Sequence, residues 1–404
     1  MESKNTEILR KIGYIIILLV VSLPLAKGYI LESGDIVTWV RRIDEVRANF
    51  RSPWGAMFPS PVLIAECGGE LSSLNSNLWL FLPAVLRGLG FSITNTYRIY
   101  MLLLNVIALW GTYKLFAEWT ADKWLAFVGV VLFMTCPYRV YICYDKADLG
   151  MVAAWSFIPV AFWSVLRLCR GKADWKKMLL AGASIAAVAY GNGILWLAVI
   201  GILLVGFVWH GKWKCLLSVL FGMVLSVPGM IRWGQYLWLG DSNVANMPLG
   251  VIAPKGYVIG QFLNSWTYRE DCPGFGIGLL LGLAIFGWLY FAQREDVPQH
   301  KYGYGLFVLL LTAFMSMQRF PWDILQRLGA PFLRLISLIE APGLFFGFTC
   351  LVTSGFGVCA AQGLWKQEKL FVKWGFLLIM LAASVGVCVY LCNDLINCRL
   401  PMYL

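Results

Sequence analysis

Charged residues are scarce in this sequence. Asp, Glu, Lys and Arg make up only 14% of its 404 residues, whereas 59% are hydrophobic. About a quarter of an ordinary soluble domain is charged, because its surface must stay hydrated, so this composition excludes a soluble globular fold. Apolar runs of roughly 15 to 20 residues recur along the chain, and helices of that length cross the hydrocarbon core of a bilayer. The sequence therefore predicts an all-α protein that spans a membrane many times.

Histidine is rarer still, and cysteine shows no ordered spacing. The two histidines, His210 and His300, fall in loops expected to face the cytoplasm, and the eleven cysteines include no Cys-x-x-Cys pair. The pattern supports neither a zinc site nor a redox motif, and it leaves no histidine for a metal site on the outer face. Proton transfer there must use a carboxylate. Carboxylates alone could still hold Mg²⁺ or Mn²⁺.

Apolar segments predict about eleven membrane spans within a single transmembrane domain, residues 1–404. The segments are 11–27, 97–117, 124–137, 150–167, 177–190, 192–209, 213–232, 275–292, 302–317, 342–362 and 372–392. Basic clusters in the loops at 167–177, 212–214 and 366–373 are expected to stay in the cytoplasm, as the positive-inside rule describes. All three fall on the same side as the N-terminus. We therefore expect a multi-pass protein whose N-terminus is cytoplasmic.

This topology places most of the connecting chain on the outer face. The outer segments are 28–96, 138–149, 233–274 and 318–341, together with the residues after 392. Within the first of them, the apolar stretch Leu78 to Leu86 contains Pro83 and is too short to span, so we expect a re-entrant or interface helix there. The outer segments therefore offer the most room for a functional site.

Arginine and lysine are distributed differently across the predicted membrane. Most arginines fall in the outer segments, whereas most lysines lie on the cytoplasmic side. Arginine's planar guanidinium binds phosphate through two parallel hydrogen bonds and is poorly replaced by lysine, so this pattern indicates a phosphate-binding outer surface. The net charge of +11 does not indicate nucleic-acid binding, because the basic residues are divided by the bilayer and interleaved with acids. Anionic lipid is the expected partner.

An amphipathic helix is expected soon after the first span. Trp39, Val40, Ile43 and Val46 fall on one helical face, with charged residues on the other face, among them Arg41 and Arg42. Asp35 precedes this helix and has two interpretations. It is either a helix cap, which an Asp at a helix start favours, or a general base at the membrane surface.

The outer segment 138–149 is dense in reactive side chains. It holds three tyrosines, two carboxylates and two bases, namely Tyr138, Arg139, Tyr141, Tyr144, Asp145, Lys146 and Asp148. One interpretation is a salt-bridged turn with tyrosines at the headgroup level, as in aromatic belts. The other is a substrate site in which Asp145 or Asp148 is catalytic.

At these residues the sequence resembles the bacterial and archaeal membrane proteins labelled 6-pyruvoyl-tetrahydropterin-synthase-related, which belong with the GT-C glycosyltransferases. The label implies no pterin chemistry. The resemblance covers roughly residues 1–170 well and the rest only as a pattern of spans. The motifs that carry it are Gly34-Asp35, Leu82-Pro83-Ala84, Pro137-Tyr138-Arg139 and the stretch 144–150.

This resemblance implies a GT-C-like fold in the cytoplasmic membrane of a prokaryote, with interface helices in the first outer loop. It also implies a sugar donor carried on a polyprenyl phosphate and a glycan, lipid or protein acceptor in the cell envelope. Asp35 matches the family's catalytic acid after the first span. Asp148, Lys146 or Arg139 matches a second functional group on the next outer loop, beside Tyr138, Tyr144 and Asp145.

Two departures from the family pattern keep other functions open. Met151 stands where the family has Glu, and a late motif that ends in arginine is reduced here to Glu340 and the residues after it. Arg319, Arg327 or Arg334 could supply the missing arginine from the same outer segment. The alternatives are a transporter or flippase for a lipid-linked glycan, and a catalytically inactive assembly protein with a GT-C-like scaffold.

Overall fold

The computed structural model describes residues 4–50, 57–58, 60, 75–171, 174–239, 249–263, 273–292, 300–365 and 370–402. Within this part the regular elements are all helices. Two isolated β-bridges, Leu31 with Pro401 and Tyr257 with Met317, pair extended segments. Predicted outer residues such as Asn243 and Trp266 lie outside the described ranges.

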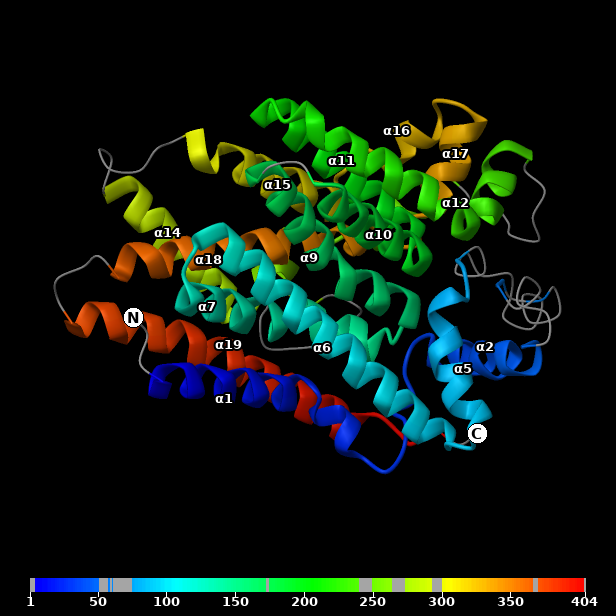
Figure 1. The fold of residues 1–404 in the computed structure, drawn as a ribbon, viewed down its shortest axis with the longest axis horizontal. Helices are drawn as coiled ribbons and strands as arrows, with labels where there is room; N and C mark the ends of the chain where they lie inside the picture. Colours follow the sequence, from blue (N-terminus) through cyan, green and yellow to red (C-terminus); the bar gives the residue numbers. More distant parts are fainter. Residues whose placement is uncertain are drawn as a thin grey trace.

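A bundle of long helices forms the body of the molecule (Figure 1). Its helices are α1 (Lys4–Val21), α6 (Ile93–Thr120), α7 (Lys123–Met134), α9 (Leu149–Arg170), α10 (Trp175–Gly191), α11 (Gly193–His210), α12 (Leu216–Leu239), α14 (Ile277–Ala292), α15 (His300–Ser316), α18 (Phe346–Trp365) and α19 (Leu370–Cys398). Each predicted span coincides with one of these helices.

Short helices occupy the connections. They are α2 (Ile36–Ala48), α5 (Phe81–Gly88), α8 (Pro137–Val140), α13 (Ile259–Leu263), α16 (Trp322–Gln326) and α17 (Ala330–Ser337), the 3₁₀ turns η1 (Leu23–Ala26), η3 (Leu78–Leu80), η5 (Trp213–Cys215), η6 (Ala253–Lys255) and η7 (Pro342–Phe345), and the π-helical turn η4 (Tyr141–Asp145).

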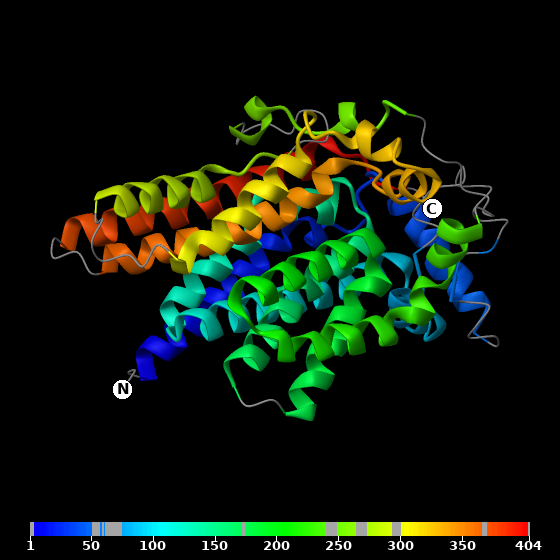
Figure 2. The ribbon, with the colours of Figure 1, turned by 90° about the horizontal axis from the view of Figure 1, so that it is seen from above.

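Most of these short helices gather at one end of the bundle, which we call the site end. There α1, α10, α12, α15 and α19 finish, and α6, α9, α11, α14 and α18 begin (Figures 1 and 2). Helices α1 and α19 lie side by side, so the N-terminus is at the opposite end and the C-terminus at the site end. Because the chain runs back and forth, all the predicted outer segments meet at the site end.

Six of the bundle helices are long and apolar enough to cross a membrane. They are α6, α9, α11, α12, α18 with η7, and α19. Helix α7 and the segment Pro137–Asp145 would count as a seventh span, bent by 54° at the break between them, and Ile277–Phe291 and Tyr302–Ser316 are shorter apolar helices. The protein is therefore a multi-pass membrane protein, while the number eleven stays a prediction.

Helices α2 and α5 pack against each other at the site end. The apolar face predicted for α2 is confirmed, since Trp39, Ile43 and Val46 are buried. The predicted position of Arg42 is wrong: its side chain lies on this buried face instead of the charged one. Three contacts explain the burial, because Nε donates to Asn77 Oδ1 (2.8 Å), Nη2 donates to the Asn75 carbonyl (2.9 Å), and the guanidinium lies 4.2 Å from the Trp39 ring centre.

Glycines bring α9 and α10 close together at the site end. A Cβ on Gly191 would lie 2.7 Å from both the Ala154 nitrogen and the Gly150 carbonyl oxygen, so the two backbones touch only because both positions lack side chains. The contact sets the start of α11, where Asn192 Oδ1 caps the helix by accepting from the Leu195 N–H (3.0 Å). Asn192 is thereby held beside the start of α9.

Candidate functional site

A cavity of about 670 Å³ lies at the site end. Each predicted outer segment contributes to its lining, through Asp35, Asp148, Lys255, Glu340 and Arg399 in chain order. Among the described lining residues, four carry carboxylates and three carry basic groups: Asp35, Asp145, Asp148 and Glu340, with Lys146, Lys255 and Arg399. The two predicted site segments, after α1 and before α9, therefore face one shared space.

Gly34 brings Asp35 against the loop that carries Lys146. Its φ of +31° is disfavoured for other residues, and a Cβ there would lie 2.0 Å from the Lys146 carbonyl oxygen. That same oxygen accepts the Asp35 backbone N–H at 2.9 Å. Gly34 is thus required for the close approach, and Asp35 and Lys146 have fixed relative positions.

Asp35 occupies the N-cap position of α2, but its carboxylate makes no capping hydrogen bond. Other caps behave differently: Asp122 accepts the Trp124 and Leu125 N–H groups at the start of α7, and Asp174 accepts the Lys176 N–H at the start of α10. The helix-cap interpretation therefore accounts for the position of Asp35 but not for the orientation of its carboxylate.

Lys146 is surrounded by carboxylates. Its Nζ lies 3.5 Å from Glu340 Oε2, and Asp148 and Asp35 also act on its charge. Burial disfavours the charged ammonium, but these three carboxylates outweigh burial and raise the pKa of Lys146 above its usual range. Lys146 is therefore positively charged at neutral pH.

Asp148 caps α9, with Oδ1 accepting the Met151 N–H at 3.0 Å, and its side chain is 3% exposed. Burial raises the pKa of Asp148, and the nearby Glu340 adds to this effect, whereas Lys146 and the Met151 N–H oppose it. The site thus contains one carboxyl with a raised pKa beside a permanently charged ammonium.

Arg399 is a lining residue that the sequence did not indicate. It forms an ion pair with the buried Asp145. The backbone around it is held by pairing between the C-terminal segment and the turn before α2: the Glu32 N–H donates to the Leu400 carbonyl (2.8 Å), and the Met402 N–H donates to the Ile30 carbonyl (2.8 Å). A basic residue on a predicted outer segment was the only signal in the sequence.

Polar and aromatic lining residues from other segments were also missed. They are Asn75, Asn192, Trp233, Tyr257 and Gln261. No motif marked them, because their place in the lining depends on the packing of the whole bundle. The segment 233–274 was expected to be outside, and its described part supplies three of these side chains.

Six of the predicted site residues line the cavity and six do not. Those in the lining are Asp35, Tyr138, Asp145, Lys146, Asp148 and Glu340, and those outside it are Arg41, Arg42, Arg139, Tyr144, Arg319 and Arg334.

The predicted residues outside the lining have other positions. Arg139 is buried within the bundle, where Nη2 donates to Asn105 Oδ1 (3.2 Å) and Ser156 Oγ (3.3 Å). The Tyr144 hydroxyl donates to the Val21 carbonyl (2.7 Å). Arg334 Nη1 donates to the Leu237 carbonyl (2.8 Å), while Arg41 and Arg319 are exposed. These contacts connect helices and do not contribute to the cavity.

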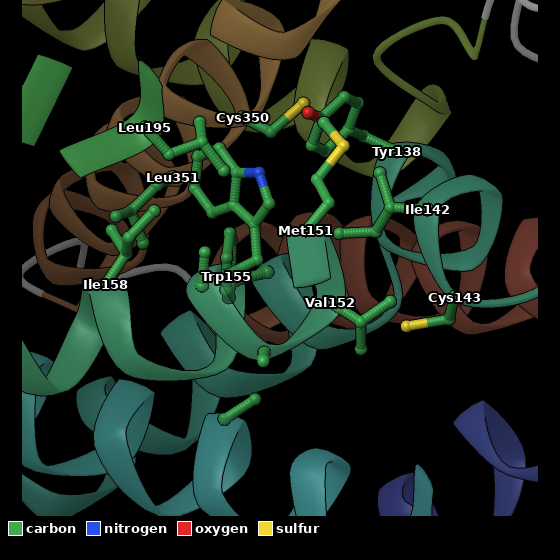
Figure 3. Close-up of a cluster of buried hydrophobic side chains, with 14 of the residues drawn as sticks. Tyr138, Ile142, Cys143, Met151, Val152, Trp155, Ile158, Leu195, Cys350 and Leu351 are labelled. Atoms are coloured by element: carbon green, nitrogen blue, oxygen red, sulfur yellow. The ribbon is translucent and has the colours of Figure 1, made fainter. Parts of the chain in front are cut away.

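A cluster of buried hydrophobic side chains adjoins the cavity, and Figure 3 shows part of this cluster. Tyr138 and Met151 line the cavity and also belong to the buried cluster beneath it. The Tyr138 hydroxyl donates to the Leu344 carbonyl (3.0 Å), and its ring meets Trp155 edge-on with 5.6 Å between centres. Met151 therefore makes this part of the lining apolar.

The lining carboxylates raise the question of whether the cavity could hold a metal ion. Within the residues that the structure describes, no group of three or more His, Cys, Asp or Glu side chains could share a metal ion. The four lining carboxylates are instead distributed around Lys146 and Arg399. A Mg²⁺ or Mn²⁺ ion at this cavity stays a prediction.

Comparison with known proteins gives a likeness of fold. No protein-family model and no curated protein matches this sequence, so the resemblance to the pterin-synthase-related family stays a prediction. The structure is similar to arabinofuranosyltransferase AftD from Mycobacteria, with a TM-score of 0.53 and 14% identity. The match covers 94% of this chain and 26% of that one.

A second similar structure is the Archaeoglobus fulgidus oligosaccharyltransferase in its apo form, with a TM-score of 0.48 and 13% identity over 96% of this chain and 56% of that one. The chain thus spans about a quarter of one neighbour's length and about half of the other's. At these identities the likeness to AftD shows an architecture shared with a membrane glycosyltransferase.

Proposed function

We propose that this protein is a membrane glycosyltransferase that takes a sugar from a polyprenyl phosphate and transfers it to a cell-envelope glycan, lipid or protein on the outer face. One observation carries the proposal: Asp35, the neighbouring Lys146 and Asp148, and Glu340 come from three segments far apart in the sequence and line a single cavity at the site end. The architecture shared with AftD supports the same enzyme class.

The position of the cavity suits a donor held in the membrane. It lies where the apolar helices finish, and the exposed apolar side chains of α5, Leu82 and Val85, lie at this same end. A polyprenyl chain would stay among lipid tails while its phosphate and sugar reach the polar cavity.

In the proposed reaction Asp35 is the general base. The acceptor hydroxyl oxygen attacks the anomeric carbon of the donor sugar, and its proton passes to the Asp35 carboxylate. The bond between the anomeric carbon and the phosphate oxygen breaks, and its electron pair leaves with the polyprenyl phosphate. The products are the glycosylated acceptor and the free lipid phosphate.

The charges around the cavity suit both halves of this step. Positive charge develops on the sugar in the transition state of glycosyl transfer, and the lining carboxylates can stabilise it. The departing phosphate is anionic and requires cations, which Lys146, Lys255 and Arg399 supply. No step needs a metal ion.

The floor of the cavity argues against the transporter alternative. A transport pathway would continue the polar cavity toward the middle of the bundle. Below the lining, however, Tyr138 packs on Trp155, and Trp155 packs on Phe348 with 4.8 Å between ring centres. The inactive-scaffold alternative is decided by the activity measurement below.

The proposal is tested by sugar transfer or release from a panel of polyprenyl-phosphate sugars, with the purified protein in nanodiscs. We expect turnover with one donor and a loss of roughly 100-fold or more in Asp35→Asn, because general bases contribute that much. Asp44→Asn is the matched control, since Asp44 is on the same helix, pairs with Arg87 (3.0 Å) and does not line the cavity. Lipid binding without turnover on any donor would favour the scaffold or flippase.

A further inference from the structure

One part of the cavity lining is polar but carries no charge. Asn75, Asn192 and Trp233 line the cavity and come from three different segments; we call them the neutral patch. They differ in chemistry from the ion pairs of Lys146 with Glu340 and of Arg399 with Asp145.

A hydrogen bond and a close packing contact hold the three segments of the neutral patch together. The Trp79 indole N–H donates to the Ala187 carbonyl (3.0 Å), which fixes the segment after Asn75 to α10. A Cβ on Gly193 would lie 2.5 Å from the Trp233 ring, so the start of α11 sits directly on α12. Asn192 lies between α10 and α11, and therefore between these two contacts.

The neutral patch has hydrogen-bonding capacity that the described residues do not use. Within the described part of the chain, Trp233 Nε1 and Asn75 Oδ1 are buried and have no hydrogen-bond partner, and their residues are 4% and 5% exposed. Asn192 is half-buried, and its Oδ1 caps α11 while its amide group carries two N–H donors. Buried polar groups in this state are destabilising until a ligand or water satisfies them.

We infer that the neutral patch binds the sugar unit of the acceptor, and that this unit is an uncharged carbohydrate. Hydroxyl groups both donate and accept, so they match an indole donor, an amide donor and an amide acceptor, whereas phosphates and carboxylates would gain more from the cationic residues. The inference rests on the proposed function.

The acceptor is favoured over the donor because the neutral patch contains no cation, and the donor phosphate requires one. The Asn75 carbonyl accepts a hydrogen bond from Arg42 on α2 (2.9 Å), the helix that begins directly after Asp35. Helix α2 therefore links the neutral patch, which would hold the acceptor hydroxyl, to the proposed base Asp35. The donor phosphate belongs with the cations on the other chain segments.

Two substitutions remove one donor each and keep the local structure. Trp233→Phe removes the indole N–H but keeps an aromatic ring, and Asn192→Ser keeps an oxygen that can cap α11 but removes the amide. Trp238→Phe is the matched control, because Trp238 is on the same helix and 85% exposed. Each lost hydrogen bond should raise the acceptor KM by roughly 3- to 10-fold.

The assay compares two reactions of the same protein in nanodiscs. One is transfer to methyl glycosides and disaccharides of neutral sugars, with methyl glucuronide as the charged comparison, and the other is hydrolysis of the donor by water without acceptor. We expect Trp233→Phe and Asn192→Ser to raise the KM for neutral acceptors while the KM for donor in hydrolysis stays within twofold. An unchanged acceptor KM, a preference for methyl glucuronide, or an equal rise in the donor KM would overturn the inference.

A binding measurement separates this inference from the proposed function. Saturation-transfer NMR detects the same methyl glycosides and disaccharides on the protein without turnover. If no donor is turned over but Trp233→Phe abolishes saccharide binding and Trp238→Phe does not, the transferase proposal fails and the neutral patch stands. If donor hydrolysis occurs but neutral saccharides bind equally to wild type and Trp233→Phe, the neutral-patch assignment fails alone.

Discussion

At the scale of single residues, Asp35 and Asp148 show how one residue type takes two roles. Both begin a helix, but Asp148 caps α9 while the Asp35 carboxylate makes no cap of α2. The sequence predicted that both residues lie in outer segments, but it allowed two interpretations of Asp35, a helix cap or a general base. It could not separate them, because the difference depends on Gly34 lying against Lys146, a contact across more than 100 residues.

Asp148 also allows a prediction about stability and pH. Its folded pKa is raised, so its ionisation is unfavourable in the folded protein, and stability is lost as pH rises from the ordinary carboxyl pKa through the folded value. Asn caps a helix as well as Asp does. We therefore expect Asp148→Asn to unfold at an equal or higher temperature than wild type at pH 7, and the difference to shrink toward pH 4.

Thermal unfolding in detergent at several pH values checks this, with Asp122→Asn at the exposed cap of α7 as the matched control. A clearly lower unfolding temperature for Asp148→Asn at pH 7 would mean that the ionised carboxylate stabilises the fold, contrary to the account.

At the scale of elements, hydropathy predicted helices well and their irregularities poorly. Every predicted span coincides with a helix, because lipid requires internally bonded backbone. The 54° bend after α7 and the short helices α16 and α17 carried no comparable signal. The apolar face of α2 was readable from its period, but the burial of Arg42 was not, since its partners Asn75 and Asn77 lie over 30 residues away.

Arg42 is therefore expected to stabilise α2 and not to bind donor phosphate. Arg42→Gln would remove the hydrogen bonds to Asn77 Oδ1 and to the Asn75 carbonyl, at a loss of about 2 kcal/mol in folding free energy. The unfolding temperature should fall while the KM for donor stays nearly constant. The exposed neighbour Arg41→Gln should change the unfolding temperature little; a large rise in donor KM specific to Arg42→Gln would show a direct phosphate role instead.

At the scale of the whole molecule, the cavity exists because the chain returns to it from both ends. Asp145 and Arg399 are 254 positions apart, and the segment after α19 pairs with the turn after α1. Topology alone predicted that the outer segments meet. Which of their side chains enter the cavity was not predictable, because that depends on the packing of many helices. Arg139, Tyr144 and Arg334, for example, connect helices instead.

The ion pair between Asp145 and Arg399 is expected to hold the C-terminal segment at the site. Replacing either partner breaks this ion pair, so Asp145→Asn and Arg399→Gln should each lower sugar release about 10-fold, and the double variant should be no worse than either single one. The control is a double-mutant cycle on the exposed ion pair of Glu7 and Lys11, 2.8 Å apart on α1. There the effects of the two single substitutions should simply add. Independent, multiplying losses at Asp145 and Arg399 would contradict a shared role.

The central claim, that the cavity at the site end binds a lipid-linked sugar for transfer, is tested most directly by an experimental structure with a polyprenyl-phosphonate sugar that cannot be cleaved. The account predicts the phosphonate in contact with Lys146, Lys255 or Arg399, the anomeric carbon facing Asp35, and the lipid chain leaving the cavity toward the membrane. Density for the ligand at any other place, with the cavity unchanged, would contradict it.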